Sequence, residues 1–447
     1  LAAGLGLRIL FAMRLDTFPL ADHALGADVA DYTAWARDIV GGRLLWTRPH
    51  IHTPLYPTVL AGLLVVTGMQ IPAVRLLQLL PEAAGGIALV GCLFFRGHRR
   101  AAAATAWLWA IHIPLLGYAS NLVSESLLLF LLPLAFFFYI FAEKTFEKRP
   151  GRAAALFGGA GLAAGLAVTS HPLAVSAGIS LLALSVRRLR SAGAPYRLGT
   201  VCLAAGLLLP PLAVSVRNLS LPGGYFGLQA RSGLNVYIGN RADATGTCSV
   251  RPGAPFREQL AAAEAAGART VAARDRYFLE RTWRDIRQSP FRWLGLLARK
   301  TLLTWNAREI PSGSDLPQLR RQLPLHGVSW PGFGLTGPLA LAGLWLCRRK
   351  SAYLPFVLTA TVHTALLALL VTSGRYRIPL VLAALPLAGG ALAETGRLAA
   401  AGARRRLAAV VCLSAVGAAV AWGLQPPPLP TAEEEALSLR AEADVRS

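Results

Sequence analysis

The chain has little charge and few acidic residues for its length. Only 15% of its 447 residues are charged, and 23 Asp and Glu stand against 45 Lys and Arg, of which only four are Lys. Five cysteines without a CxxC pair exclude a disulfide framework and a cysteine-based metal site. With 54% hydrophobic residues and a mean hydropathy of +0.47, a soluble protein of this size is excluded as well. The sequence therefore predicts a polytopic membrane protein.

The net charge of +22 points to acidic partners. In a soluble protein such a charge would favour nucleic acid. Here the basic residues gather in short links between apolar runs, where they set the orientation of membrane helices. We therefore expect membrane lipids as partners and no nucleic acid.

Apolar runs of about the length that crosses a bilayer recur along the chain. We read about eleven spans, at 1–15, 72–95, 101–119, 121–142, 153–169, 172–186, 198–216, 331–346, 353–371, 378–396 and 407–424. The expected fold class is an all-α integral membrane protein. Segment 54–68 is also apolar, but counting it as a span breaks the pattern of basic links, so we expect a juxtamembrane helix there.

With this count the basic links all fall on one side, at 96–100, 143–152, 187–197, 347–350 and 397–406. The positive-inside rule makes that side cytoplasmic, in the plasma membrane of a bacterium. Residues 1–424 then form one membrane domain with two outer loops, 25–71 and 217–330. Because the chain opens at Leu1 within an apolar run, we expect a short segment before it, and the polar tail 425–447 is expected to be mobile.

The first outer loop combines acids with aromatic rings. If residues 28–40 are helical, Asp28, Tyr32 and Trp35 share one face, with Asp31 beside them, and Gly41-Gly42 ends the helix. An acid over an aromatic floor suits the deprotonation of a sugar hydroxyl. The alternative is an interfacial amphipathic helix whose acids only face water.

Other polar residues on the expected outer side each have a structural alternative. Glu125 is an acid at the start of a span, where the helix dipole also favours it. His171 precedes Pro172 and suits a tight turn. The long outer loop carries Asn235, Tyr237 and Asn240, with two flanking glycines that suit the shaping of the loop, then expected helices at 254–287 and 289–306. Arg375 and Arg377 begin a late span, where they can also snorkel to the headgroups.

Several of these motifs resemble bacterial glycosyltransferase family 39. They are D-x-x-x-Y followed by Gly-Gly and H-T-P-L-Y-P between 28 and 57, G-L-N-V-Y-I-G-N at 233–240 and G-R-Y-R-I-P-L at 374–380. That family is related to protein O-mannosyltransferases and aminoarabinose transferases. The resemblance implies a GT-C type fold and an active site on the extracytoplasmic face. It also implies a sugar donor linked to polyprenyl phosphate.

The resemblance also implies roles for individual residues. Asp28 is the implied catalytic base and Asp31 the second choice, although many relatives have Asp-Glu where this chain has Asp28-Val29. Arg375 and Arg377, on either side of Tyr376, are implied to bind the donor phosphate, which makes a metal dispensable. No DxD motif occurs, so we expect no metal and no cofactor. The residues that we expect to contact sugar or acceptor are Tyr32, His50, His52, Tyr56, Glu125, Asn235, Tyr237 and Asn240. For His50 and His52 the alternative is a place at the membrane interface without a site role.

The expected function is that of an inverting glycosyltransferase acting on a glycan, lipid or protein acceptor. A transporter or flippase of lipid-linked sugars is the alternative from another class. It should show ionisable residues at mid-membrane depth or broken helices in two matching halves, and neither is evident in the sequence. A non-catalytic relative that binds a lipid-linked sugar is a third possibility.

Overall fold

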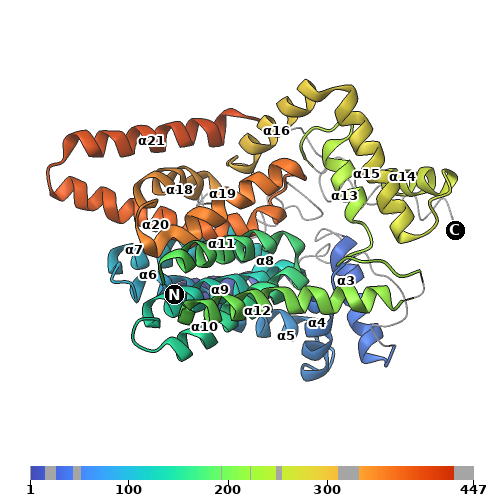
Figure 1. The fold of residues 1–447 in the computed structure, drawn as a ribbon, viewed down its shortest axis with the longest axis horizontal. Coiled ribbons are helices and arrows are strands. Elements are labelled where there is room, and N and C mark those ends of the chain that lie inside the picture. Colours follow the sequence, from blue (N-terminus) through green and yellow to red (C-terminus); the bar gives the residue numbers. More distant parts are fainter. Residues whose placement is uncertain are drawn as a thin grey trace.

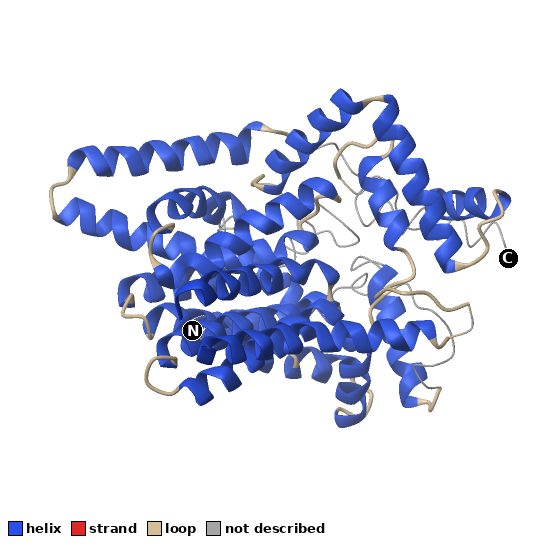
Figure 2. Ribbon diagram, in the orientation of Figure 1, coloured by secondary structure: helices blue, strands red, loops and turns tan. Residues whose placement is uncertain are grey.

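The computed structural model describes residues 2–15, 27–43, 52–192, 194–221, 223–247, 254–310 and 332–426. These segments are almost entirely helical, as Figure 2 shows. Within them the only extended pairing is an isolated bridge between Thr247 and Thr372. His50 and the tail from 427 onward lie outside the described residues, so the predictions made for them stay predictions.

Apolar helices form a bundle. They are α1 (Ala2–Leu15), α5 (Ile71–Leu77), α6 (Leu79–Phe94), α7 (Arg99–Ile111), α8 (Ile113–Ser120), α9 (Ser124–Thr145), α10 (Pro150–Ser170), α11 (Val175–Ala192), α12 (Ala194–Leu219), α18 (Phe333–Cys347), α19 (Leu354–Leu369), α20 (Ile378–Ala400) and α21 (Arg404–Gly423). A helix occupies each of the eleven expected spans. The prediction of an all-α membrane protein is confirmed.

Not every one of these helices is long enough to cross a bilayer alone. Among the described residues eight helical segments are long and apolar enough, and α7 with α8 makes a ninth if the pair, bent by 59°, is one span. The bend falls at His112, whose backbone is extended, before α8 restarts with a proline in its first turn. With 14 and 15 residues, α1 and α18 are shorter than the roughly 20 that a span needs.

Small residues let the bundle helices approach closely. A Cβ on Gly161 of α10 would overlap the carbonyl oxygen of Leu203 in α12, and one on Gly206 of α12 would overlap the carbonyl oxygen of Gly158. In lipid, where apolar contact alone does not favour one helix over the acyl chains, such close packing is what holds helices together.

A buried ion pair fixes α1 to the bundle. Arg8 Nε lies 2.8 Å from Glu82 Oε2 with both side chains fully buried, and the guanidinium lies 3.7 Å from the centre of the Trp109 ring. Glu82 stands midway along the span 71–94, so the sequence-based expectation of no ionisable residue at that depth is wrong. The arginine also donates to the carbonyls of Gly4, Trp109 and Ala110, which marks the pair as a structural contact.

The helices of the two expected outer loops, named the outer helices, lie together at one end of the molecule (Figure 1). They are α3 (Ala27–Val40), α4 (Leu55–Val66), α13 (Ser232–Asn240), α14 (Ala254–Ala265), α15 (Val271–Gln288) and α16 (Pro290–Thr304). At 12 residues α4 is too short to span, consistent with the expected juxtamembrane helix. The single helix expected at 254–287 is two helices, because the chain turns at Gly267 with a φ of +85°.

Segment 233–240 is a helix and not the shaped loop that its glycines suggested. A Cβ on Gly233 would overlap the backbone of Asp275 in α15, and one on Gly239 would overlap the carbonyl oxygen of Leu370. The two glycines therefore serve close packing of α13 on both sides.

A buried lysine ties the outer helices to the bundle. Lys300 of α16 is fully buried, and its Nζ donates to Asn240 Oδ1 at 2.9 Å and to the Leu370 carbonyl at 2.7 Å. Trp293 Nε1 donates to the same amide oxygen at 2.9 Å, while Asn240 Nδ2 donates to the Leu369 carbonyl at 2.8 Å. The residues just before Arg375 are thus held by two outer helices.

The lysine makes stability depend on pH. Burial, and then the charge of Arg292, lowers the pKa of Lys300 to about 7. Between about pH 7 and the ordinary lysine value near 10.4 the unfolded chain binds more protons than the folded one, so stability rises with pH across that window. We expect this rise in thermal unfolding of the purified protein and its disappearance in Lys300→Met. An equal rise in that variant would contradict the assignment.

Candidate active site

Asp28 and Tyr32 project from the first two turns of α3. The helix predicted from the sequence is confirmed, and it ends where Gly42 takes a φ of +76°. Val29, Tyr32 and Ala36 are buried against the bundle, which leaves Asp28 at the edge of the packed face. Its side chain is 19% exposed, whereas that of Asp31 is 49% exposed. The structure therefore separates the two acids that the sequence left as first and second choice.

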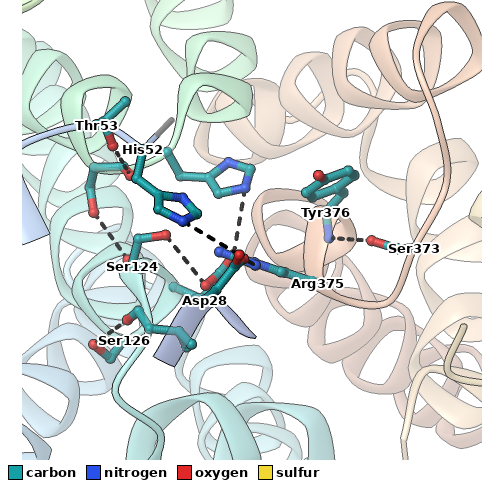
Figure 3. Close-up of polar contacts among 12 residues, drawn as sticks. Asp28, His52, Thr53, Ser124, Ser126, Ser373, Arg375 and Tyr376 are labelled. Atoms are coloured by element: carbon teal, nitrogen blue, oxygen red, sulfur yellow. Dashed lines mark hydrogen bonds and ion pairs between the residues drawn. The ribbon is translucent and has the colours of Figure 1, made fainter. Parts of the chain in front are cut away.

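Arg375 lies between two carboxylates. Its Nη1 donates to Asp28 Oδ2 and its Nε donates to Glu125 Oε1, as Figure 3 shows for Asp28. The arginine opens the short helix Arg375–Arg377 that leads into α20, and Glu125 lies in the first turn of α9. Three elements far apart in sequence thus meet through one guanidinium.

Further cations and polar groups surround Asp28. His52 Nε2 lies 3.4 Å from Asp28 Oδ1 and 3.4 Å from Asp31 Oδ2, and Arg231 Nη2 lies 3.9 Å from Asp28 Oδ1. Burial alone would raise the pKa of Asp28, but the charges of Arg375, His52 and Arg231 outweigh it and hold the pKa well below its usual range. The carboxylate is therefore ionised at neutral pH.

His171 stands behind this cluster as a neutral ring. Its Nε2 lies 3.5 Å from Glu125 Oε1. Burial, and then the charge of Arg375, lowers the pKa of His171 to about 3. The sequence-based interpretation gave this histidine a place in a tight turn, and it does precede the short helix Pro172–Ala174, but it also lines the site.

Aromatic rings form the floor beneath Asp28. The Tyr32 ring lies 4.5 Å from the His52 ring and 5.1 Å from the Tyr56 ring, between ring centres. The Tyr32 hydroxyl donates to Ser124 Oγ at 3.2 Å, and that of Tyr56 donates to Gln78 Oε1 at 3.4 Å. The sequence predicted Asp28 over Tyr32 and Trp35, and the structure groups Tyr32 with His52 and Tyr56. The use of these rings to hold a sugar stays a prediction.

A cavity of about 210 Å³ opens beside these residues. Its lining combines polar side chains from the first outer loop, the starts and ends of spans, and α13. The lining residues include Tyr32, His52, Ser170, Arg231, Asn235, Arg375 and Tyr376. A pocket with this mixture of ring faces, hydroxyls and cations is suited to a sugar phosphate.

The structure does not bring every predicted residue to this cavity. Arg377 is fully buried elsewhere, 2.9 Å from Glu309 Oε1, with its guanidinium 4.8 Å from the centre of the Phe333 ring. Asn240 is engaged by Lys300 and Trp293, and Tyr237 packs on Phe278 at 5.4 Å between ring centres. Among the described residues Arg375 is thus the arginine of its pair that reaches Asp28.

Sequence reasoning missed Arg231, Ser124 and Ser170 as site residues. Arg231 stands among many arginines of the long outer loop, and nothing in its local sequence distinguishes it. The two serines line the cavity from the start of α9 and the end of α10, and Ser170 Oγ donates to the Ser124 carbonyl at 3.0 Å. Only the approach of the two helices shows their role.

One group of side chains has the composition of a cation site. Asp28, Asp31 and His52 each offer a ligand atom, and these atoms lie within 4.8 Å of one another. Two carboxylates and an imidazole are ligands for several divalent metals. Arg375 already occupies one oxygen of Asp28, so a metal and the arginine would compete for that carboxylate.

The fold defines a class of protein, namely a membrane-embedded helical protein of GT-C type. The archaeal oligosaccharyltransferase AglB from Archaeoglobus fulgidus, in complex with an inhibitory peptide and a dolichol-phosphate, aligns with a TM-score of 0.50 and 14% identity over 98% of this chain and 55% of its own. The chain therefore spans about half the length of that protein. ArnT from Cupriavidus metallidurans bound to undecaprenyl phosphate aligns at 15% identity and a TM-score of 0.39, over 88% of this chain and 77% of its own. No protein-family model and no curated protein sequence matches the chain.

Proposed function

We propose that the protein is an inverting glycosyltransferase that moves a sugar from a polyprenyl-phosphate donor to an acceptor hydroxyl. The observation that carries the proposal is Arg375, held between Asp28 and Glu125 at the edge of a cavity at one end of a membrane bundle. A guanidinium at that place can bind a phosphate group through two hydrogen bonds. The similarity of fold to AglB, which was solved with a dolichol-phosphate, supports the same class of donor.

The proposed reaction needs a base and a cation in one place. When the donor phosphate binds Arg375, the guanidinium exchanges its contact with Asp28 for the phosphate oxygens. Asp28 then accepts the proton of the acceptor hydroxyl, whose oxygen forms a bond to the anomeric carbon. The bond from that carbon to the phosphate oxygen breaks on the opposite face, and the polyprenyl phosphate leaves as an anion beside Arg375 and Arg231. Tyr32 and His52 line the cavity, and in this proposal they contact the sugar.

The test is transfer by purified protein in liposomes. The donors are polyprenyl-phosphate sugars of several kinds, and mass spectrometry of envelope glycans and lipids from a deletion strain names the acceptor to supply. We expect inverted product and free polyprenyl phosphate in equal amounts. Movement of the lipid-linked sugar across the bilayer without its cleavage would instead indicate a flippase, and donor binding without either event would indicate a non-catalytic relative.

We propose that the active site faces away from the cytoplasm. The basic links on the opposite side of the predicted topology support this orientation. Cysteines introduced near residues 30, 240 and 374 are expected to react with an impermeant thiol reagent in intact cells, and those near 98, 148, 190 and 349 only after lysis. Protection of residue 240 in intact cells would contradict the orientation.

We also propose that transfer needs no metal, because Arg375 supplies the positive charge at the leaving phosphate. Transfer is therefore expected to continue at an unchanged rate after EDTA treatment and to gain nothing from added Mg²⁺ or Mn²⁺. Loss of transfer in EDTA with recovery in Mn²⁺ would make Asp28, Asp31 and His52 a metal site and would overturn this part of the proposal.

A further inference from the structure

A second cavity, of about 200 Å³, lies at the end of the bundle opposite the candidate active site. Both sites are built on α9: Glu125 belongs to the first, and Tyr139, Ile140 and Glu143 line the second. Eighteen residues separate Glu125 from Glu143 along one helix, about 27 Å at 1.5 Å per residue. This is close to the roughly 30 Å of a bilayer's hydrocarbon core, so the second cavity lies at the other membrane boundary.

Three arginines line this cavity against one acid. Arg96, Arg187 and Arg188 come from the turn after α6 and the end of α11, whereas Glu143 is the one carboxylate in the lining among the residues that the structure describes. Glu143 is engaged already, because it accepts a hydrogen bond from the Tyr196 hydroxyl and lies 3.4 Å from Arg188 Nε. The site therefore keeps an excess of positive charge.

The other two arginines are available for a ligand to different degrees. Arg96 Nη2 donates to Ser351 Oγ at 2.7 Å, which holds its side chain at the rim. Arg187 is exposed and makes no hydrogen bond or ion pair with any residue that the structure describes. The span 351–369 also begins at the cavity, and the positive end of its helix dipole favours an anion there.

The rest of the lining is largely apolar. Ile140, Leu184, Leu354 and Pro355 lie on the same walls as the arginines. A free inorganic anion gains no favourable contact from apolar side chains. A phospholipid, in contrast, presents a phosphate group to the arginines and acyl chains to the apolar residues. Basic pockets between membrane helices at a bilayer boundary are the usual setting for anionic lipid headgroups.

We infer that this cavity binds a phosphate group, and that the group is the headgroup of an anionic phospholipid in the leaflet opposite the candidate active site. Arg187 and Arg96 contact the phosphate oxygens, Arg188 with Glu143 and Tyr196 forms the fixed wall, and the apolar residues contact the first part of the acyl chains. The inference is independent of the proposed glycosyltransferase activity.

Native mass spectrometry of the purified protein in detergent tests this inference. In detergent no charged bilayer surface is present to attract the arginines, so the measured lipid binding reports on the cavity. Phosphatidylglycerol is titrated against phosphatidylcholine, which carries the same phosphate without net charge. An arginine beside an anionic lipid contributes about a fivefold change in affinity, so we expect Arg187→Gln to weaken phosphatidylglycerol binding about fivefold and Arg96→Gln with Arg187→Gln about 25-fold. The matched control is Arg349→Gln, an exposed arginine in a basic link of the sequence outside the lining, which should change binding less than twofold.

The possible outcomes of this binding experiment distinguish a lipid headgroup, a soluble phosphate and no specific site. Weaker phosphatidylglycerol binding in the cavity variants alone, with no displacement by inorganic phosphate, supports the lipid headgroup. Displacement by inorganic phosphate in the wild type, lost in Arg187→Gln, supports the phosphate site but assigns it to a soluble phosphate. Equal binding of the two lipids, or an equal effect of Arg349→Gln, would overturn the inference. Unchanged thermal unfolding of each variant shows that a loss of binding is not a loss of fold.

Discussion

Replacing Asp28 by Asn is expected to abolish sugar transfer while the fold persists. The amide keeps the shape of the side chain but cannot accept the proton of the acceptor hydroxyl. General base catalysis contributes typically 10²- to 10⁴-fold, so the rate constant of transfer should fall by at least the lower of these factors. Initial rates of transfer at saturating donor provide the measurement.

Asp31→Asn is the matched control for this result. Asp31 is on the same helix and also lies 3.4 Å from His52, but its side chain is 49% exposed, and among the described residues Arg375 pairs with Asp28 and Glu125 instead. We expect its transfer rate to stay within a few fold of the wild type. A dead Asp31→Asn enzyme beside an active Asp28→Asn enzyme would assign the base to the other carboxylate.

Replacing Arg375 is expected to have the second large effect, on both donor binding and stability. Arg375→Ala leaves Asp28 and Glu125 close together without the cation between them, and removing one partner of a buried ion pair costs about 3–5 kcal/mol of folding free energy. Arg375→Lys keeps the charge but cannot reproduce the two-pronged contact, so we expect it to weaken binding of the polyprenyl-phosphate donor at least tenfold.

A double variant separates the two roles of this arginine. Arg375→Gln with Glu125→Gln removes the cation and one anion together, so its unfolding temperature should recover toward the wild type. Donor affinity should stay as low as in Arg375→Ala, because no guanidinium is present to bind the phosphate. Recovery of donor affinity along with stability would show that Arg375 only holds the fold.

Local sequence was sufficient to predict the helix that carries Asp28. Spacing of acid and aromatic residues and the Gly41-Gly42 pair fixed both the face and the end of α3, and the structure has both. Apolar runs were likewise sufficient to locate the bundle helices, because lipid requires a long apolar run wherever the chain crosses.

Contacts between segments that are distant in the chain could not be predicted from local sequence. Arg375 and Arg377 flank one tyrosine and look equivalent in sequence. Of these two arginines, however, Arg377 pairs with Glu309, whereas Arg375 pairs with Glu125 and Asp28. The choice depends on which carboxylates the fold brings near each arginine. The same holds for Arg8 and Glu82, whose pairing across 74 residues leaves no local pattern.

The fastening of α13 and α16 to the bundle limits how the protein can be recombined with others. Asn240 and Lys300 bind the carbonyls of Leu369 and Leu370, and Gly239 leaves room for the second of these. A chimaera that exchanged the outer helices alone would set foreign side chains against residues 369–371, four to six positions before Arg375. The outer helices and the segment leading to Arg375 must therefore be exchanged together to keep these contacts, although more than sixty residues of chain lie between α16 and that segment.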